Sequence, residues 1–383
     1  PSAERRRSGS HYTPRDLTGP IVRRTLDPQL ARLAAASPTG AARANDILDL
    51  KVCDPAMGSA AFLVETCRYL GDAVVQAWAA HGDREDEIPA DEDEAVFARR
   101  LVAQKCIYGV DRNPMAVELA KVSIWLATLA RDHPFTFIDH AFKHGDSLVG
   151  LSKRQLEGLN WDASATPLNW LLPEIGTAFE RLKQARRAIQ EAKEGVGHGA
   201  LARLLADADA AADDVRFFGD LVVSAFFDAD KPPARRHALE ARTFSLQRAR
   251  GSDFRDQLQA RRSGERPLVP FHWELEFPEV FDRPGAGFDA FVGNPPFMGG
   301  RNLSASAGET YSAWLLDANE GTTGGADLVA HFFRRAFKLL RTGGTLGLIA
   351  TNTIAQGDTR ASGLRWICTH DGEIYHATRR LPW

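Results

Sequence analysis

The sequence has few cysteines and no pattern that would use them as ligands. There are four in 383 residues, and no Cys pair or Cys/His pair has the spacing of zinc ligands. We therefore expect buried thiols, and neither a disulfide framework nor a metal site. The cysteines are Cys53, Cys67, Cys106 and Cys368.

The sequence also lacks long apolar runs and a leader. No run approaches the roughly 20 residues needed to cross a bilayer. The basic residues 5–7 are not followed by the apolar stretch of a secretory signal. These shortages predict a cytoplasmic protein with no membrane partner.

Net charge is small as well. The formal value of −3 excludes a uniformly basic protein that coats DNA, although a local basic face remains compatible with it. What is present is an ordinary globular composition, with 44% hydrophobic and 25% charged residues. The length predicts two or three compact units.

The first 150 residues alternate between strand-like and helix-like segments. Residues 48–53 and 106–110 read as strands, and each precedes a helical pattern, at residues 59–80 and 114–129. A possible third strand precedes Gly145. Successive strand-helix units predict a parallel sheet covered by helices, hence an α/β fold.

Residues 151–266 read as a helical insertion that splits this sheet. From residue 231 onward the insertion carries ten Lys and Arg against four acids, a local balance of +6. A solvated helix face and a surface that follows DNA phosphates explain this excess equally well.

Alternation resumes after the insertion. We expect strands at residues 288–292, 345–350 and 373–377, and helices at 326–340 and 363–369. The Gly/Ser/Thr-rich residues 298–325 predict a loop, either a mobile one over a bound substrate or a plain surface loop.

Acidic residues follow the first three predicted strands. Asp54 opens the small-residue turn at residues 54–60, which lets a ligand approach a helix N-terminus. Asp111 is suited to accept hydrogen bonds from ribose hydroxyls, and Asp146 from an adenine amine. The alternative for each is a helix cap or an ordinary turn. Three acids at successive strand ends favour a nucleoside site.

The most specific motif is residues 293–297, Gly-Asn-Pro-Pro-Phe, directly after a strand. Its two prolines stiffen the backbone, so Asn294 and the Pro295 carbonyl become fixed acceptors. They can hold an exocyclic amine while its lone pair attacks a methyl group, and Phe297 can stack on a flipped base. A rigid loop without function is the alternative.

The order HYTP, DPAMGSAAFL, GVDRNPMAVELA, GDSL, GNPPF and GGTLGLIATN resembles class I N6-adenine DNA methyltransferases of the gamma arrangement, which use S-adenosylmethionine. It is most similar to the catalytic part of type IIG restriction-modification enzymes and of the DISARM and BREX phage-defence methyltransferases. The resemblance implies a Rossmann-like fold with a mostly parallel, seven-stranded type of sheet interrupted by the insertion.

The resemblance also implies roles for single residues. An N-terminal motif would close over the methionine end of the cofactor, a second group would line the cofactor along its length, and a third would hold the target base. The first group is Tyr12, Thr13 and Pro14; the second is Asp54, Ala56 and Gly58 for methionine, Asp111 for ribose, and Asp146 and Leu148 for adenine; the third is Asn294, Pro295, Pro296 and Phe297.

The chain departs from the family motif DPACGSGxFL at two positions, where it has Met57 for Cys and Ala60 for Gly. The resemblance divides the chain into a cofactor half at residues 1–150, the insertion at 151–266 and a catalytic half at 267–383. It also implies a further hairpin and a target-recognition domain after Trp383.

The implied reaction is methyl transfer from S-adenosylmethionine to the N6 amine of an adenine flipped out of double-stranded DNA, in a restriction-modification or phage-defence system that can include other subunits. The alternatives are methylation of a protein glutamine amide, cytosine N4-methylation, and a non-catalytic DNA-binding module. No nuclease centre is evident, and His11 and His144 receive no role because direct attack by the amine requires no histidine base.

Overall fold

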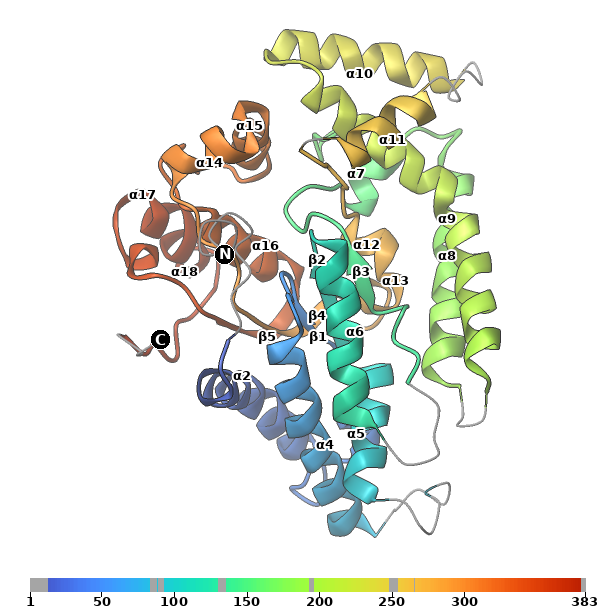
Figure 1. The fold of residues 1–383 in the computed structure, drawn as a ribbon, viewed down its shortest axis with the longest axis vertical. Helices are drawn as coiled ribbons and strands as arrows, with labels where there is room; N and C mark the ends of the chain where they lie inside the picture. The colour runs from blue at the N-terminus through green and yellow to red at the C-terminus, as the bar shows by residue number, and fades with distance from the viewer. Residues whose placement is uncertain are drawn as a thin grey trace.

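A parallel sheet of five strands lies at the centre of the structure, a computed structural model (Figure 1). The structure describes residues 13–82, 88, 93–129, 136–192, 196–247, 254–264 and 266–379. Within these residues the strand order is β3-β2-β1-β4-β5, and every neighbouring pair is parallel. The strands are β1 (Val52–Asp54), β2 (Ile107–Asp111), β3 (Phe142–His144), β4 (Phe288–Gly293) and β5 (Leu340–Leu348).

This order confirms the predicted α/β fold with a Rossmann-like sheet. From β1 the chain moves outward through β2 to β3, and it then returns to the other side of β1 to form β4 and β5. The strand order therefore reverses between β1 and β4. In open parallel sheets, ligands bind outside the carboxyl ends of the strands at such a point.

The helices predicted at residues 59–80 and 114–129 are confirmed, whereas three further helices of the first half were not predicted. Figure 1 shows α4, α5 and α6 side by side, with α6 beside the strands and α4 and α5 extending below them. The predicted strand at residues 48–53 begins only at Val52, because residues up to Leu48 form a short helix instead. The helices are α2 (Arg15–Ala36), α3 (Ala44–Leu48), α4 (Ala61–His81), α5 (Glu94–Lys105) and α6 (Pro114–Thr128).

The insertion is helical, as predicted, and forms the upper right part of Figure 1. Its apolar core is shared with the segment after β4: the rings of Phe226 and Trp314 lie 5.0 Å apart, edge to face. The insertion therefore packs on the segment after β4 through side chains. Its helices are α7 (Lys153–Glu157), α8 (Leu172–Gln190), α9 (His198–Phe227), α10 (Pro232–Gln247) and α11 (Arg255–Ser263).

An aromatic cluster joins the chain that leaves the insertion to the sheet. The short helices α12 (Trp273–Glu276) and α13 (Pro278–Phe281) bring Phe277 within 5.0 Å of the Tyr108 ring on β2, and Tyr108 lies 5.5 Å from Phe288 on β4. Edge-to-face pairs of this kind add to the free energy of apolar burial. The chain that leaves the insertion is thus anchored to the sheet by aromatic residues of the central core.

The prediction of a loop at residues 298–325 is wrong for most of that stretch. It contains α14 (Gly300–Ala307) and α15 (Glu309–Ala318). Tyr311, Trp314 and Leu315 are buried, and their i, i+3, i+4 spacing is that of one helix face. Burial of this face outweighs the loop-like composition around it. The next helix, α16 (Leu328–Leu339), is capped by Asp327.

The C-terminal part differs from the sequence expectation at two points. β5 begins at Leu340 and passes through Gly343 and Gly344, which form an irregularity in its pairing with β4 rather than a turn before the strand. The predicted strand at residues 373–377 is absent: residues 372–379 form neither helix nor strand, and the Tyr375 hydroxyl donates to the Arg24 carbonyl of α2 at 3.2 Å.

The region between β5 and this tail is helical, which confirms the helix expected at residues 363–369. It comprises η2 (Asn352–Ala355), α17 (Gly357–Arg360), η3 (Ala361–Arg365) and α18 (Trp366–Cys368). Cys368 is exposed, so the expectation of four buried thiols holds for only three of them. Across the described residues, every helix is too short or too polar to cross a bilayer.

Candidate functional site

The carboxyl ends of four strands gather the polar residues singled out in the sequence. Asp54 ends β1, Asp111 ends β2, Asp146 follows β3 by two residues, and Asn294 follows β4 directly. Because the strands are parallel and adjacent, these four side chains belong to one edge of the sheet. The reversal of strand order lies between Asp54 and Asn294.

Asp54 is a buried carboxylate in the turn after β1. It is 1% exposed, and its Oδ1 accepts from the Ala56 N–H at 3.0 Å. Burial is the main cause that raises the pKa of Asp54; the Ala56 N–H opposes the rise and the nearby Asp111 adds to it, and the resulting pKa is about 8. Much of this group is therefore protonated at neutral pH.

Asp111 connects the second strand to the same turn. Its Oδ2 accepts from the Gly58 N–H at 2.9 Å, and its Oδ1 accepts from the Asn113 N–H at 2.8 Å. Asn113 is the N-cap of α6, which excludes the alternative that Asp111 caps that helix. Burial raises the pKa of Asp111, while the Asn113 and Gly58 N–H groups lower it.

The two departures from the family motif are accommodated in different ways. Ala60 adopts a left-handed conformation with φ 65°, which explains why glycine suits this position in the family. Met57 is buried against β2: a Cβ atom on Gly109 would lie 2.2 Å from the Met57 sulfur. Glycine at 109 therefore leaves the room that the longer side chain needs.

The segment after β3 is tied to the first turn. The Ser147 hydroxyl donates to the Pro55 carbonyl at 2.5 Å, and Ser147 in turn accepts at its carbonyl from Trp273 Nε1 at 3.0 Å. Asp146 and Leu148, on either side of Ser147, are both buried. Within the described residues the Oδ2 atom of Asp146 is buried and without a hydrogen-bond partner.

Asn294 joins the N-terminal segment to the end of β4. Its Nδ2 donates to the Thr13 hydroxyl at 3.3 Å, although 281 positions separate the two residues. Its Oδ1 is buried and finds no hydrogen-bond partner among the described residues. The preceding Gly293 lies against the first turn, since a Cβ atom there would lie 2.6 Å from Asp54 Oδ1.

The remaining predicted residues flank this arrangement. Pro295 is buried and Pro296 half-buried, while Phe297 is half-buried and packs on a cluster that contains Val329 and Phe333 of α16. Pro14 is exposed at the N-terminus of α2. Tyr12 lies outside the described residues.

Three residues that the sequence patterns did not single out also contact this edge. Tyr311 and Trp314 of α15 contact Asp146 and Leu148, and Arg112 lies 3.8 Å from Asp146 Oδ2. The helical spacing of Tyr311, Trp314 and Leu315 was the signal that could have identified α15 as a packed helix.

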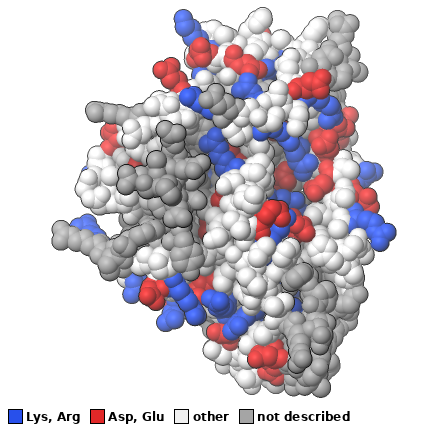
Figure 2. All heavy atoms as spheres, in the orientation of Figure 1, with Lys and Arg blue, Asp and Glu red and all other residues white. Residues whose placement is uncertain are grey.

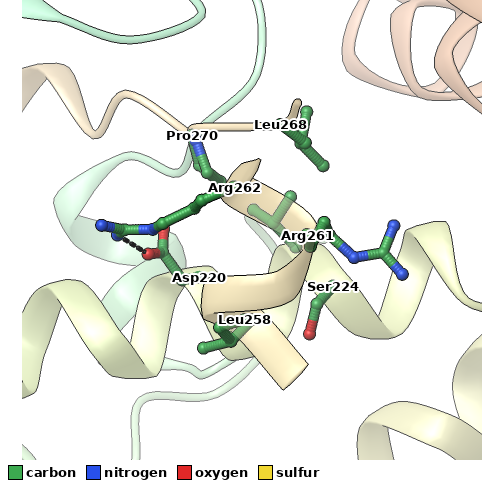
Figure 3. Close-up of a pocket in the computed structure, with 8 residues that line it drawn as sticks. Asp220, Ser224, Leu258, Arg261, Arg262, Leu268 and Pro270 are labelled. Carbon is green, nitrogen blue, oxygen red and sulfur yellow. Dashed lines mark hydrogen bonds and ion pairs between the residues drawn. The ribbon is translucent and has the colours of Figure 1, made fainter. Parts of the chain in front are cut away.

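Four arginines of the basic part of the insertion pair with acids of the insertion itself. Arg242 and Arg261 both pair with Asp228, and Arg255 pairs with two aspartates of α9 at 3.2 and 2.8 Å. Figure 3 shows Arg262 paired with Asp220 beside a small pocket. On the face drawn in Figure 2, basic and acidic side chains are interspersed over this region. These contacts favour a structural use of the positive charge.

Comparison with known proteins agrees with this arrangement. The N-6 DNA Methylase family matches residues 2–153, and the Eco57I restriction-modification methylase family matches residues 105–374. A Methanocaldococcus jannaschii protein assigned as a type II restriction enzyme and methyltransferase is 22% identical over 422 residues, which cover 93% of this chain and 33% of the relative. This chain therefore spans about a third of that relative. Since the match at residues 105–374 covers more than half of the sequence, the chain belongs to the Eco57I restriction-modification methylase family, a family of DNA methyltransferases.

Proposed function

We propose that this chain transfers a methyl group from S-adenosylmethionine to the N6 amine of an adenine flipped out of double-stranded DNA, within a restriction-modification or phage-defence system. The observation that carries the proposal is the Oδ1 atom of Asn294, a buried acceptor without a partner among the described residues. An unpaired buried acceptor is costly, so its presence at the strand-order reversal favours a ligand that donates to it.

The Asn294 side chain is suited to hold an amine. Its Nδ2 donates to Thr13, which leaves the amide oxygen as the free acceptor. An amine that donates to this oxygen and to the Pro295 carbonyl keeps its lone pair for attack on an electrophile. Pro296 stiffens the same turn, and Phe297 offers a ring on which the flipped base can stack.

The neighbouring strand ends suit the methyl donor, S-adenosylmethionine. Asp54 is buried and Asp111 half-buried, and neither forms a salt bridge within the described residues. A cation bound beside them would favour their ionised forms and pair with them. S-adenosylmethionine, when bound, supplies an electrophilic methyl group on a positively charged sulfur. The free Oδ2 of Asp146 suits the amine of its adenine.

On this proposal each part of the chain has a task. Residues 1–150 bind the cofactor: Tyr12, Thr13 and Pro14 close over its methionine end, Ala56 and Gly58 line that end, and Leu148 borders the adenine. Residues 267–383 hold the base, and residues 151–266 are the inserted helical part. Alignment of reacting groups, without a covalent enzyme intermediate, can lower the barrier by about 7–11 kcal/mol.

Replacement of Asn294 tests the proposal. Asn294→Ala should reduce methyl transfer to duplex DNA at least 100-fold, because the amine loses its side-chain acceptor, while the affinity for S-adenosylmethionine stays within about twofold. Transfer is measured with a tritiated methyl group, and affinity by calorimetry. The base that carries the label is identified after digestion to nucleosides.

Asn45→Ala serves as the matched control, since Asn45 is exposed on α3 before the amino end of β1. It should retain full transfer. Undiminished transfer by Asn294→Ala would contradict the assignment. Label on protein glutamine or on cytosine, rather than adenine, would replace it with one of the alternative substrates.

A further inference from the structure

The two carboxylate oxygens of Asp146 have different surroundings. Oδ1 accepts from the Leu148 N–H at 3.0 Å and from the Tyr311 hydroxyl at 3.2 Å. Oδ2 is buried and has no hydrogen-bond partner among the described residues. The Nε atom of Arg112 lies 3.8 Å from Oδ2, beyond hydrogen-bond distance. One oxygen is thus satisfied by the chain itself, and the other is left as an acceptor.

The helix α15 fixes this segment through a second side chain. Trp314 Nε1 donates to the Leu148 carbonyl at 3.1 Å, and Arg335 donates to the same carbonyl at 3.1 Å. Both backbone groups of Leu148 are therefore occupied, because its N–H donates to Asp146. The free Oδ2 of Asp146 is consequently the main polar group that this segment can offer a ligand.

Tyr311 is a well-defined donor in this arrangement. Its side chain is 5% exposed, and the Arg112 guanidinium lies 5.6 Å from the centre of its ring. Burial and the negative charge of Asp146 raise the pKa of Tyr311 well above its ordinary value. The hydroxyl therefore keeps its proton at neutral pH and donates a hydrogen bond to Oδ1.

We propose that Tyr311 is a positioning residue that sets cofactor specificity: by occupying Oδ1 of Asp146, it holds Oδ2 as the acceptor for the 6-amino group of the cofactor's adenine. This inference rests on the proposed function. Without the hydroxyl, the carboxylate can rotate and Oδ2 can move toward Arg112, which removes the acceptor from the ligand. A purine without the amino group gains nothing from this geometry, so the effect of Tyr311 is specific to that group.

The inference also connects the two halves of the site. Tyr311 belongs to the segment that follows the base-holding Phe297, and it contacts the segment after β3 across 165 positions of sequence. The element that continues from the target-base motif therefore orients the side chain that reads the cofactor.

The test compares two ligands by calorimetry: S-adenosylhomocysteine and the analogue whose purine carries hydrogen in place of the 6-amino group. The full chain should prefer the adenosyl ligand by about tenfold or more, as expected for a hydrogen bond to a charged acceptor. Tyr311→Phe should lose most of this preference, with the loss falling on the adenosyl ligand. Trp314→Phe should weaken both ligands equally, and the exposed Tyr375→Phe should change neither.

Asp146→Asn tests the orientation without changing Tyr311. If the Leu148 N–H and the Tyr311 hydroxyl both donate to Oδ1, the amide nitrogen must take the position of Oδ2, and the preference for the amino group should disappear. An Asp146→Asn variant that keeps the preference would overturn the inference, because the amide would then have turned freely. An equal weakening of both ligands by Tyr311→Phe would also overturn it.

Failure of the proposed function gives a different result. In that case the unaltered chain binds neither ligand, whereas failure of the inference alone leaves a selective unaltered chain and a selective Tyr311→Phe variant. Thermal unfolding of each variant shows that the compared proteins are folded.

Discussion

At the scale of single residues, the carboxylate of Asp54 carries the clearest electrostatic consequence. The group is buried, has a pKa of about 8, and lies near a second carboxylate, Asp111, that raises this pKa. The carboxyl group of Asp54 is mostly neutral below about pH 8, and a cation bound beside it favours the ionised form. Binding of a cationic cofactor should therefore release a proton.

This predicts that the affinity for S-adenosylmethionine rises with pH, by up to about tenfold per unit between roughly pH 6 and pH 8, and then levels off. Asp54→Asn should bind more weakly and lose this pH dependence. Calorimetric titrations over this range, in buffers of different ionisation enthalpy, report both the affinity and the proton release. A constant affinity for the unaltered chain, with no proton release, would contradict the role of Asp54.

The sequence predicted that the acids and Asn294 lie at strand ends, because strand ends are readable from apolar runs that stop at a polar residue. It could not identify the partner of each oxygen. Thr13 and Asn294 are 281 positions apart, and Tyr311 and Asp146 are 165 apart, so no local pattern connects them. These contacts depend on how the parallel strands are ordered, which spacing alone does not specify.

At the scale of elements, alternation predicted the strands and helices of the core, because apolar periodicity survives wherever one face is buried. It failed where composition and packing disagree. α15 is a helix within a Gly/Ser/Thr-rich stretch because Tyr311, Trp314 and Leu315 are buried on one face. Residues 373–377 have strand composition, but Tyr375 contacts the helix α2 instead of a neighbouring strand.

The crossing of two segments beside Asp146 gives a prediction at this scale. Gly150 is in contact with the chain that returns from the insertion: a Cβ atom there would lie 2.0 Å from the Phe271 carbonyl oxygen and 2.6 Å from its carbon. Backbone atoms cannot yield as a flexible side chain can, so Gly150→Ala should lower the free energy of unfolding by about 2–4 kcal/mol.

Gly176→Ala is the matched control, because Gly176 lies inside α8 and a Cβ atom there meets nothing within 4 Å. It should leave stability unchanged or raise it by about 0.5–1 kcal/mol, since alanine favours helices. Urea unfolding of both variants checks the pair. Equal stability of the two variants would mean that the backbone at Gly150 and Phe271 can move apart without loss of unfolding free energy.

At the scale of the whole molecule, the insertion is bound to the core through both apolar and polar contacts. Phe226 packs on Trp314 of α15, and His272, next to the central aromatic cluster, lies 3.3 Å from Asp220 of α9. Part of the positive excess seen in the sequence of residues 231–266 is offset in space by aspartates that lie before that range: Asp213, Asp214, Asp220 and Asp228. A count within one segment could not reveal this compensation.

The charge compensation predicts how DNA binding responds to salt. Each phosphate contact that is lost lowers the slope of log affinity against log salt by about 0.9. Arg255 already donates to Asp213 and Asp214, so Arg255→Gln should change the slope by less than about 0.3.

Arg236 is the matched comparison: it is exposed on α10, and the described residues place no carboxylate within ion-pair distance of it. If α10 follows the phosphates, Arg236→Gln lowers the slope by about 0.9 and Arg255→Gln does not. Equal losses of that size from both variants would show that DNA displaces the aspartates of α9, and the structural interpretation of these ion pairs would then be wrong.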